Sequence, residues 1–198
     1  MITNSSLIQI SRAVWRAYCV EGDIVVDATM GAGKDTVFLA SLVGATGLVL
    51  AVDKQKDAIT KTSGLLEVMD LSARAKLVCE DHGRLEEILT ANLTPAQLSL
   101  GLACAVFNLG YLPGGNKKNV TGAETTIAAL NTVWPALRPG GLLSVHVYSG
   151  HEGSIEEAES VSNWMRVMDW NDAQISACSQ FNKRQNVETV YFAVKKMR

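Results

Sequence analysis

The chain has 198 residues and a formal net charge of −2, and 47% of its residues are hydrophobic while 19% are charged. This balance excludes a disordered chain and a strongly basic one, although a local basic patch is compatible with it. It predicts one globular domain over residues 1–198 with a sizeable core.

Helical patterns and apolar runs alternate along the chain. Helices are predicted over 4–19, 33–43, 56–69, 83–91, 122–137 and 154–168. Strands are predicted over 23–28, 47–53, 75–80, 102–108, 141–148, 173–181 and 188–195. The alternation predicts a mostly parallel sheet with helices on both faces, and the first helix, within residues 1–20, is expected to pack on it.

The connection between the last two strands is the exception, because only residues 182–187 lie between them. Parallel neighbours need a longer crossover, so the seventh strand is predicted to pair antiparallel in a hairpin. A Rossmann-like, seven-stranded, mostly parallel sheet with an antiparallel last strand is the layout of class I methyltransferases.

A glycine turn marks the first strand–helix junction. Asp27 ends the apolar strand, Gly31-Ala32-Gly33 follow, and a helix begins at once. Such a turn brings backbone N–H groups against a ligand. Asp53 ends the second strand, with Gln55 close behind it, and an acidic residue there can accept hydrogen bonds from a ribose hydroxyl pair. A tight turn that binds nothing is the alternative.

Three ligand classes compete for this turn. A phosphate-binding loop would need glycine at Ala28 and a hydroxyl at Asp35, and a dinucleotide fingerprint would need glycine at Thr36. S-adenosylmethionine fits better, because it carries an ammonium and a sulfonium but no phosphate, which suits the charge of Asp27.

The third strand ends in Asp81 and His82, where the adenine of such a cofactor would rest. The Asp81 carboxylate can accept a hydrogen bond from the exocyclic amine, and the His82 ring can pack beside the base. Alternatively, Asp81 caps the short helix that begins near Gly83.

Asn108 ends the fourth strand and Tyr111 follows it. The segment resembles the Asn-Pro-Pro-Tyr segment of amino-group methyltransferases at its first and last positions, where the asparagine carbonyl binds the target nitrogen. The alternative is a glycine-rich loop that only turns the chain. His151, beyond the fifth strand, is a candidate to orient the substrate or accept a proton, whereas His146 is expected in the core.

Four segments together resemble one small bacterial family, first labelled putative rRNA methylases. They are Asp27-Ala-Thr-x-Gly-x-Gly-x-Asp-Thr36, Phe107-Asn-Leu-Gly-Tyr-Leu-Pro-Gly-Gly115, Glu124-Thr-Thr-Ile-Ala-Ala-Leu130 and Gly150-His-Glu-Gly153. Some members of this family are tRNA methyltransferases that methylate the aminomethyl group of a modified wobble uridine. The chain departs from the family pattern at Ala32, Lys34 and Ser149.

The resemblance implies S-adenosylmethionine as cofactor, no metal, tRNA (its anticodon arm) as partner and a homodimer. The cofactor-binding residues implied are Asp27, Thr29, Gly31, Ala32, Gly33, Asp35, Thr36, Asp53, Gln55, Asp81, His82 and Asn108. The catalytic residues implied are Asn108, Tyr111 and His151. The four scattered cysteines lack metal-site spacing and favour a reducing, cytoplasmic location.

The leading hypothesis is therefore a methyltransferase acting on 5-aminomethyl-2-thiouridine at the tRNA wobble position. The alternatives are a methyltransferase of rRNA or a small molecule, and a non-catalytic nucleotide-binding module. Candidate tRNA contacts are Lys117-Lys118, Lys183-Arg184 and Arg12 with Arg16. No apolar run has membrane-spanning length, and the first residues do not resemble a signal peptide, so we expect no membrane partner.

Overall fold

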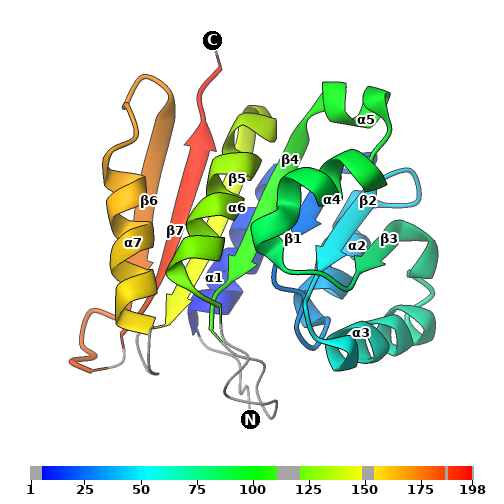
Figure 1. Cartoon of the computed structure of the whole chain (residues 1–198), viewed down its shortest axis with the longest axis horizontal. Coiled ribbons are helices and arrows are strands. Elements are labelled where there is room, and N and C mark those ends of the chain that lie inside the picture. Colours follow the sequence, from blue (N-terminus) through cyan, green and yellow to red (C-terminus); the bar gives the residue numbers. More distant parts are fainter. Residues whose placement is uncertain (1–5, 111–120, 149–153, 186, 198) are drawn as a thin grey trace.

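A computed structural model describes residues 6–110, 121–148, 154–185 and 187–197. Within these ranges the chain builds one seven-stranded sheet with helices on both faces (Figure 1). The strands are β1 (Ile24–Asp27), β2 (Leu48–Val52), β3 (Ala75–Val78), β4 (Leu102–Asn108), β5 (Leu137–Tyr148), β6 (Ala173–Ser179) and β7 (Glu188–Lys195). The helices are α1 (Ser6–Tyr18), α2 (Lys34–Val43), α3 (Lys56–Val68), α4 (Leu85–Asn92), α5 (Pro95–Leu100), α6 (Ala123–Ala136) and α7 (Ser154–Arg166), with short 3-10 turns η1 (Ser72–Arg74) and η2 (His82–Arg84).

The strand order is β3-β2-β1-β4-β5-β7-β6. The strands β3, β2, β1, β4 and β5 pair in parallel, while β7 runs antiparallel to both β5 and β6. The predicted hairpin of the last two strands is thus confirmed. Because the carboxyl ends of β1 to β5 meet at one edge of the sheet, the loops that follow these strands gather there.

Two apolar cores cover the two faces of the sheet. One holds side chains from α4, α6 and α7, and the other holds side chains from α1, α2 and α3. The central strands β1 and β4 are buried on both faces, which explains why their sequences are nearly continuous apolar runs. The N-terminal helix α1 contributes to one of these cores: Trp15 is fully buried, with its ring centroid 6.2 Å from that of Phe38 in α2.

Two elements differ from the sequence-based expectation. Helix α5 was not expected, although Thr94 and Gln97 form a capping box and Pro95 occupies the first helical position, which together mark a helix start. Strand β5 begins at Leu137 instead of residue 141, because Leu137 already pairs with Leu102 across a local irregularity in the ladder. Neither difference moves the carboxyl edge of the sheet.

Lys195, near the end of β7, caps the carboxyl end of α6. Its ammonium donates hydrogen bonds to the backbone carbonyls of Trp134, Pro135 and Leu137 at 3.2, 2.9 and 2.7 Å. The last carbonyls of a helix lack the regular partners of its interior; the Leu137 amide donates to the Trp134 carbonyl, and the Lys195 ammonium is a further donor at this end. Burial lowers the pKa of this ammonium below its ordinary value.

Candidate active site

The carboxylate of Asp27 organises the turn after β1 from inside the protein. It is fully buried, and it accepts hydrogen bonds from the Thr36 hydroxyl at 2.7 Å and from the Thr29 amide at 3.3 Å. Burial, with smaller contributions from the charges of Asp35 and Asp53, raises the pKa of Asp27 to about 7. Asp27 and Thr36 therefore stabilise the turn from its buried side. The groups of the turn that remain accessible to a ligand belong to its backbone.

The glycines of this turn are required by its conformation. Gly31 and Gly33 have φ of +54° and +79°, a region that L side chains rarely adopt. A Cβ on Gly33 would also lie 2.6 Å from the Thr62 hydroxyl oxygen and 2.9 Å from the Thr62 Cα. Gly31 and Ala32 are only partly buried, so the turn presents backbone at the carboxyl edge of the sheet.

Asp53 links the end of β2 to this turn. One of its oxygens accepts the Gly31 amide at 2.9 Å, and the other accepts the amide of Gln55 at 2.9 Å. Each carboxylate oxygen can accept a second hydrogen bond, so the group retains acceptor capacity for ribose hydroxyls. Asp53 thus stands where the sequence pattern expected it, beside the glycine turn.

Asp81 and His82 are neighbours in sequence, but their side chains have different surroundings. The Asp81 carboxylate accepts the Gly83 amide at 2.8 Å, so it does cap η2, and its side chain is still 32% exposed. The His82 ring is buried, stands edge-on to Phe107, and lies 3.3 Å from the Thr126 hydroxyl through Nε2. Burial lowers the pKa of His82 below its ordinary value. Only 7% of the His82 surface is exposed, so little of the ring is accessible for the expected packing beside an adenine.

Asn108 is held at the end of β4 by several hydrogen bonds. Its amide donates to the Thr29 hydroxyl at 2.6 Å, and its side-chain Nδ2 donates to the Asp35 carboxylate at 2.8 Å. The side-chain carbonyl Oδ1 is buried and has no hydrogen-bond partner among the described residues. A buried carbonyl left unpaired costs about 1–3 kcal/mol, and its place at the carboxyl end of β4 makes this oxygen a candidate acceptor for a donor from a ligand.

The Asp35 carboxylate also binds Arg12 of α1, a contact that the sequence analysis missed. Arg12 donates to one Asp35 oxygen from Nε at 3.0 Å and from Nη2 at 2.6 Å. Both side chains are largely buried, with 20% and 16% exposed. The charge of Arg12 is thus neutralised by the Asp35 carboxylate, and its Nε and Nη2 donors are already used. Arg12 is therefore a poor candidate for a contact with a tRNA phosphate. In the sequence, the spacing of Arg12 and Arg16 by one helical turn predicts only a small basic face on this helix.

His146 and Tyr148 of β5 form a second cluster that adjoins Asn108, the register partner of His146. Their rings are stacked with centroids 4.3 Å apart, and the Tyr148 hydroxyl lies 3.3 Å from His146 Nδ1. His146 Nε2 lies 3.6 Å from a Glu188 carboxylate oxygen. Burial lowers the pKa of His146 to about 4, so the ring is neutral at pH 7, in line with the core histidine expected. Burial raises the pKa of Tyr148 above its ordinary value, with smaller contributions from the charges of Glu188 and Asp35.

A buried carboxylate, Glu157 of α7, ties down the segment ends that flank residues 111–120. It accepts hydrogen bonds from the hydroxyls of Thr126 and Thr121, each at 2.7 Å. The Thr121 hydroxyl in turn accepts the Gly110 amide at 2.9 Å, and the Thr121 amide donates to the Gly110 carbonyl at 3.1 Å. Gly110 and Thr121 are therefore fixed side by side, two residues after Asn108.

Several expected residues lie outside the described ranges, namely Tyr111, His151, Ser149 and the pair Lys117-Lys118. In the described part of the chain no cluster of three or more His, Cys, Asp or Glu side chains is arranged to hold a metal ion. None of the described helices is long and apolar enough to cross a membrane.

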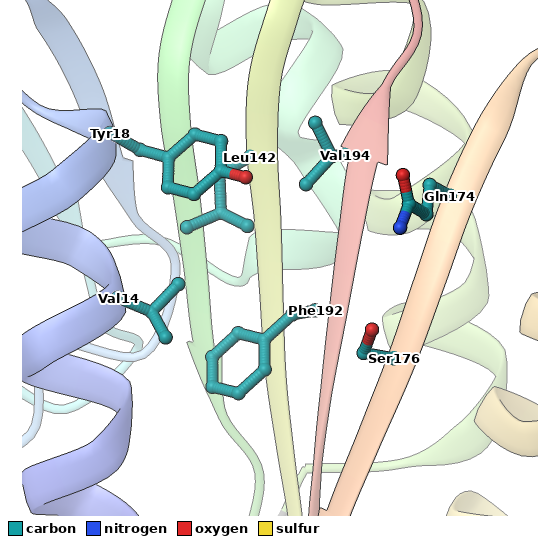
Figure 2. Close-up of a pocket in the computed structure, with 7 residues that line it drawn as sticks. All are labelled: Val14, Tyr18, Leu142, Gln174, Ser176, Phe192 and Val194. Atoms are coloured by element: carbon teal, nitrogen blue, oxygen red, sulfur yellow. The ribbon is translucent and has the colours of Figure 1, made fainter.

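A pocket of about 300 Å³ lies away from the carboxyl edge of the sheet. It is lined by α1 and by side chains of β5, β7 and β6. Figure 2 shows Val14 and Tyr18 of α1 on one side of it, with Leu142, Phe192 and Val194 along its floor and Gln174 and Ser176 on β6. Leu142 pairs with Cys104 early in β4, whereas Asn108 ends that strand. The pocket is therefore separate from the glycine turn and from Asn108.

The strand order, the glycine turn after β1 and the acidic end of β2 define the class I methyltransferase fold. The chain belongs to the family described as "Putative rRNA methylase", whose sequence model matches residues 49–194.

Three relatives bear on this assignment. A tRNA (mnm(5)s(2)U34)-methyltransferase, chloroplastic, of Arabidopsis thaliana is 39% identical over 173 residues, which are 82% of this chain and 61% of that protein. The chain thus spans about three fifths of that relative's length. A crystal structure of a putative rRNA methylase from Clostridium thermocellum is 32% identical with a TM-score of 0.87, covering 98% of this chain and 100% of that one. A putative methyltransferase of Streptococcus mutans, in complex with SAH, is 28% identical with a TM-score of 0.82, covering 98% and 99%.

Proposed function

We propose that this protein is an S-adenosylmethionine-dependent N-methyltransferase that acts on the aminomethyl group of 5-aminomethyl-2-thiouridine at the tRNA wobble position. The observation that carries the proposal is the buried, unpartnered carbonyl of Asn108 at the end of β4, a hydrogen-bond acceptor suited to an amine. The family, and the name of the Arabidopsis relative, support methyl transfer to tRNA.

The residues present fit the cofactor. The backbone of Gly31 to Gly33 would lie against its methionine part, and Asp53 would accept from the ribose hydroxyls. The Asp81 oxygen that lies 4.0 Å from the Lys54 ammonium would accept from the adenine amine. The Streptococcus mutans relative carries SAH, the product of methyl donation, in its crystal structure. When bound, S-adenosylmethionine supplies a methyl group made electrophilic by its sulfonium.

The task of the protein is then to bind a neutral amine in the right direction. A primary alkylamine resembles lysine, with a pKa near ~10.4, and is mostly protonated at pH 7. A desolvated site around Asn108 Oδ1 favours the neutral form, because burial disfavours charge. An amine N–H donated to Oδ1 fixes the direction of the nitrogen lone pair, and alignment of this kind lowers the barrier without an acid or a metal. Tyr111 and His151 stay proposed as substrate-positioning and proton-accepting residues.

Binding of an anticodon arm is part of the proposal, as is the homodimer that would pool basic patches from two copies. Of the described candidates, Lys183 lies 3.6 Å from Glu188, and Arg16 sits over the Phe38 ring. We expect tRNA binding to weaken with salt, with a log–log slope of roughly −0.7 per phosphate contact on single-stranded regions. Salt-independent binding, or a monomer at micromolar concentration, would contradict this arrangement. A cytoplasmic location is likewise proposed and is measured by cell fractionation.

Nucleoside mass spectrometry of tRNA from cells with and without the gene tests the proposed substrate. Loss of the methylated wobble nucleoside, with its aminomethyl precursor accumulating, supports the proposal. Unchanged tRNA together with a lost methyl mark in rRNA would favour the rRNA alternative. Titration calorimetry with S-adenosylmethionine and with NAD addresses the non-catalytic alternative, which predicts no selective binding of the former.

A variant separates binding from chemistry. Asn108→Ala should leave S-adenosylmethionine affinity within about twofold while methyl transfer to tRNA falls at least tenfold, because the acceptor for the amine is lost together with the Nδ2 hydrogen bond to Asp35. Full turnover in this variant would reduce the Asn108 segment to a turn.

A further inference from the structure

A chain of hydrogen bonds links the Asn108 side chain of β4 to α2 directly and to α1 through α2. Nδ2 donates to one oxygen of Asp35, in the first turn of α2, at 2.8 Å. The other Asp35 oxygen receives two hydrogen bonds from Arg12 of α1. Arg12 is itself fixed, since Nη2 also donates to the Lys34 carbonyl at 3.3 Å and the guanidinium lies 5.2 Å from the centroid of the Phe38 ring.

This series of hydrogen bonds determines the orientation of the Asn108 side-chain amide. A side-chain amide can turn over and exchange its oxygen for its nitrogen at little cost when its neighbour both donates and accepts. A carboxylate only accepts, so Asp35 must receive the NH₂ group and Oδ1 must point away from it. The backbone is already set, because the Asn108 amide is bound to Thr29 and the Leu109 amide donates to the His146 carbonyl at 2.9 Å.

The result is an oriented carbonyl that nothing in the described part of the chain satisfies. We propose that Asp35, held by Arg12, is a positioning residue that turns the Asn108 carbonyl toward the substrate amine. The proposal assigns Asp35 to orientation of the acceptor and not to cofactor binding, and it rests on the proposed function. It also gives α1 a part in catalysis through Arg12, without contact to substrate.

The test compares Asp35→Asn with Asp57→Asn. The asparagine variant at position 35 keeps the shape but can donate to Asn108 Oδ1, so the amide is free to turn over. Asp57 occupies the matching first turn of α3 and is exposed, which makes it a control for loss of one carboxylate at a helix start. Arg12→Met is a second variant, which leaves the carboxylate in place but unsupported.

Three quantities are measured on the full chain. The first is the single-turnover rate of transfer of labelled methyl from S-adenosylmethionine to tRNA from a deletion strain. The second is the S-adenosylmethionine dissociation constant by calorimetry. The third is the ¹⁵N–¹H signal of the Asn108 side-chain amide, assigned with Asn108→Ala and recorded without substrate.

We expect Asp35→Asn to lower the methyl-transfer rate at least tenfold, with cofactor affinity within twofold, and to shift the Asn108 amide signal. Arg12→Met should give a smaller loss of rate in the same direction, and Asp57→Asn should match the wild type in all three. A wild-type rate and an unshifted signal in Asp35→Asn would overturn the inference, as would a tenfold loss of cofactor affinity, which would make Asp35 a cofactor ligand. If Asn108→Ala keeps full turnover while the Asp35→Asn signal shifts, the orientation stands and the proposed role of Asn108 fails.

Discussion

Replacing Gly33 with alanine tests the turn on which the whole site depends. Gly33 precedes α2 with φ of +79°, and its Cα hydrogen faces Thr62 of α3. An added Cβ would lie 2.6 Å from the Thr62 hydroxyl oxygen and 2.9 Å from the Thr62 Cα. Because one of these atoms belongs to the backbone, rotation of a side chain cannot relieve the overlap.

The expected loss of stability has two parts. The left-handed conformation costs an L residue about 1–2 kcal/mol. Overpacking against a fixed neighbour costs about 1–3 kcal/mol more. Alanine restricts the unfolded chain and returns up to about 1 kcal/mol, so the net loss is roughly 1–5 kcal/mol. For a chain of this size that corresponds to a fall in Tm of roughly 2–20 °C.

Thermal and urea denaturation measure the change, with Gly64→Ala as the matched control. Gly64 lies inside α3 with open space where a Cβ would be, so alanine there should stabilise the protein by about 1 kcal/mol. Adding Thr62→Ala to Gly33→Ala should recover only the part due to the hydroxyl. A Gly33→Ala protein that melts with the wild type would refute the steric reasoning and the required φ together.

Three further predictions concern charged groups. Burial raises the pKa of Asp27 from 3.8 to about 7, so the folded state binds the carboxyl proton more tightly than the unfolded state does. The free energy of unfolding should therefore decrease as the pH rises from about 4 to about 7. Asp27→Asn should flatten urea-unfolding profiles over that window, by on the order of 4 kcal/mol at most; an unchanged profile would disprove the shift. Lys195→Met should lower the free energy of unfolding in urea by about 1–2 kcal/mol because three carbonyls lose the ammonium donor, although that of Trp134 keeps the Leu137 amide, whereas exposed Lys61→Met should cost nothing measurable. Asp53→Ala should weaken S-adenosylmethionine binding on the order of 1.5–3 kcal/mol by calorimetry, and equal affinities would remove Asp53 from the ribose site.

The strand ends could be predicted because their signals are local. An apolar run that stops at Asp27 or Asp53, followed by a turn, places the residue at the carboxyl edge of a parallel sheet without further information. The link between Arg12 and Asp35 could not be predicted in this way, because 23 positions separate them and α1 must first pack beside α2. The burial of His82 in η2 likewise depends on a contact with Phe107 of β4, which is distant in the sequence.

The place of β7 in the sheet has a consequence for how the chain is made. β6 is synthesised before β7, yet in the sheet it is β7 that lies beside β5 and holds β6 in place. On the ribosome, β6 therefore has no partner strand until Lys195 has emerged, and one edge of β5 stays open for the same time. The pairs among β1 to β4 involve no later strand, so they can form before β6 and β7 have been synthesised. A chain truncated between Ser179 and Glu188 would keep β1 to β5 but would leave one edge of β5 and the whole of β6 without a partner strand, and unpaired strand edges promote aggregation.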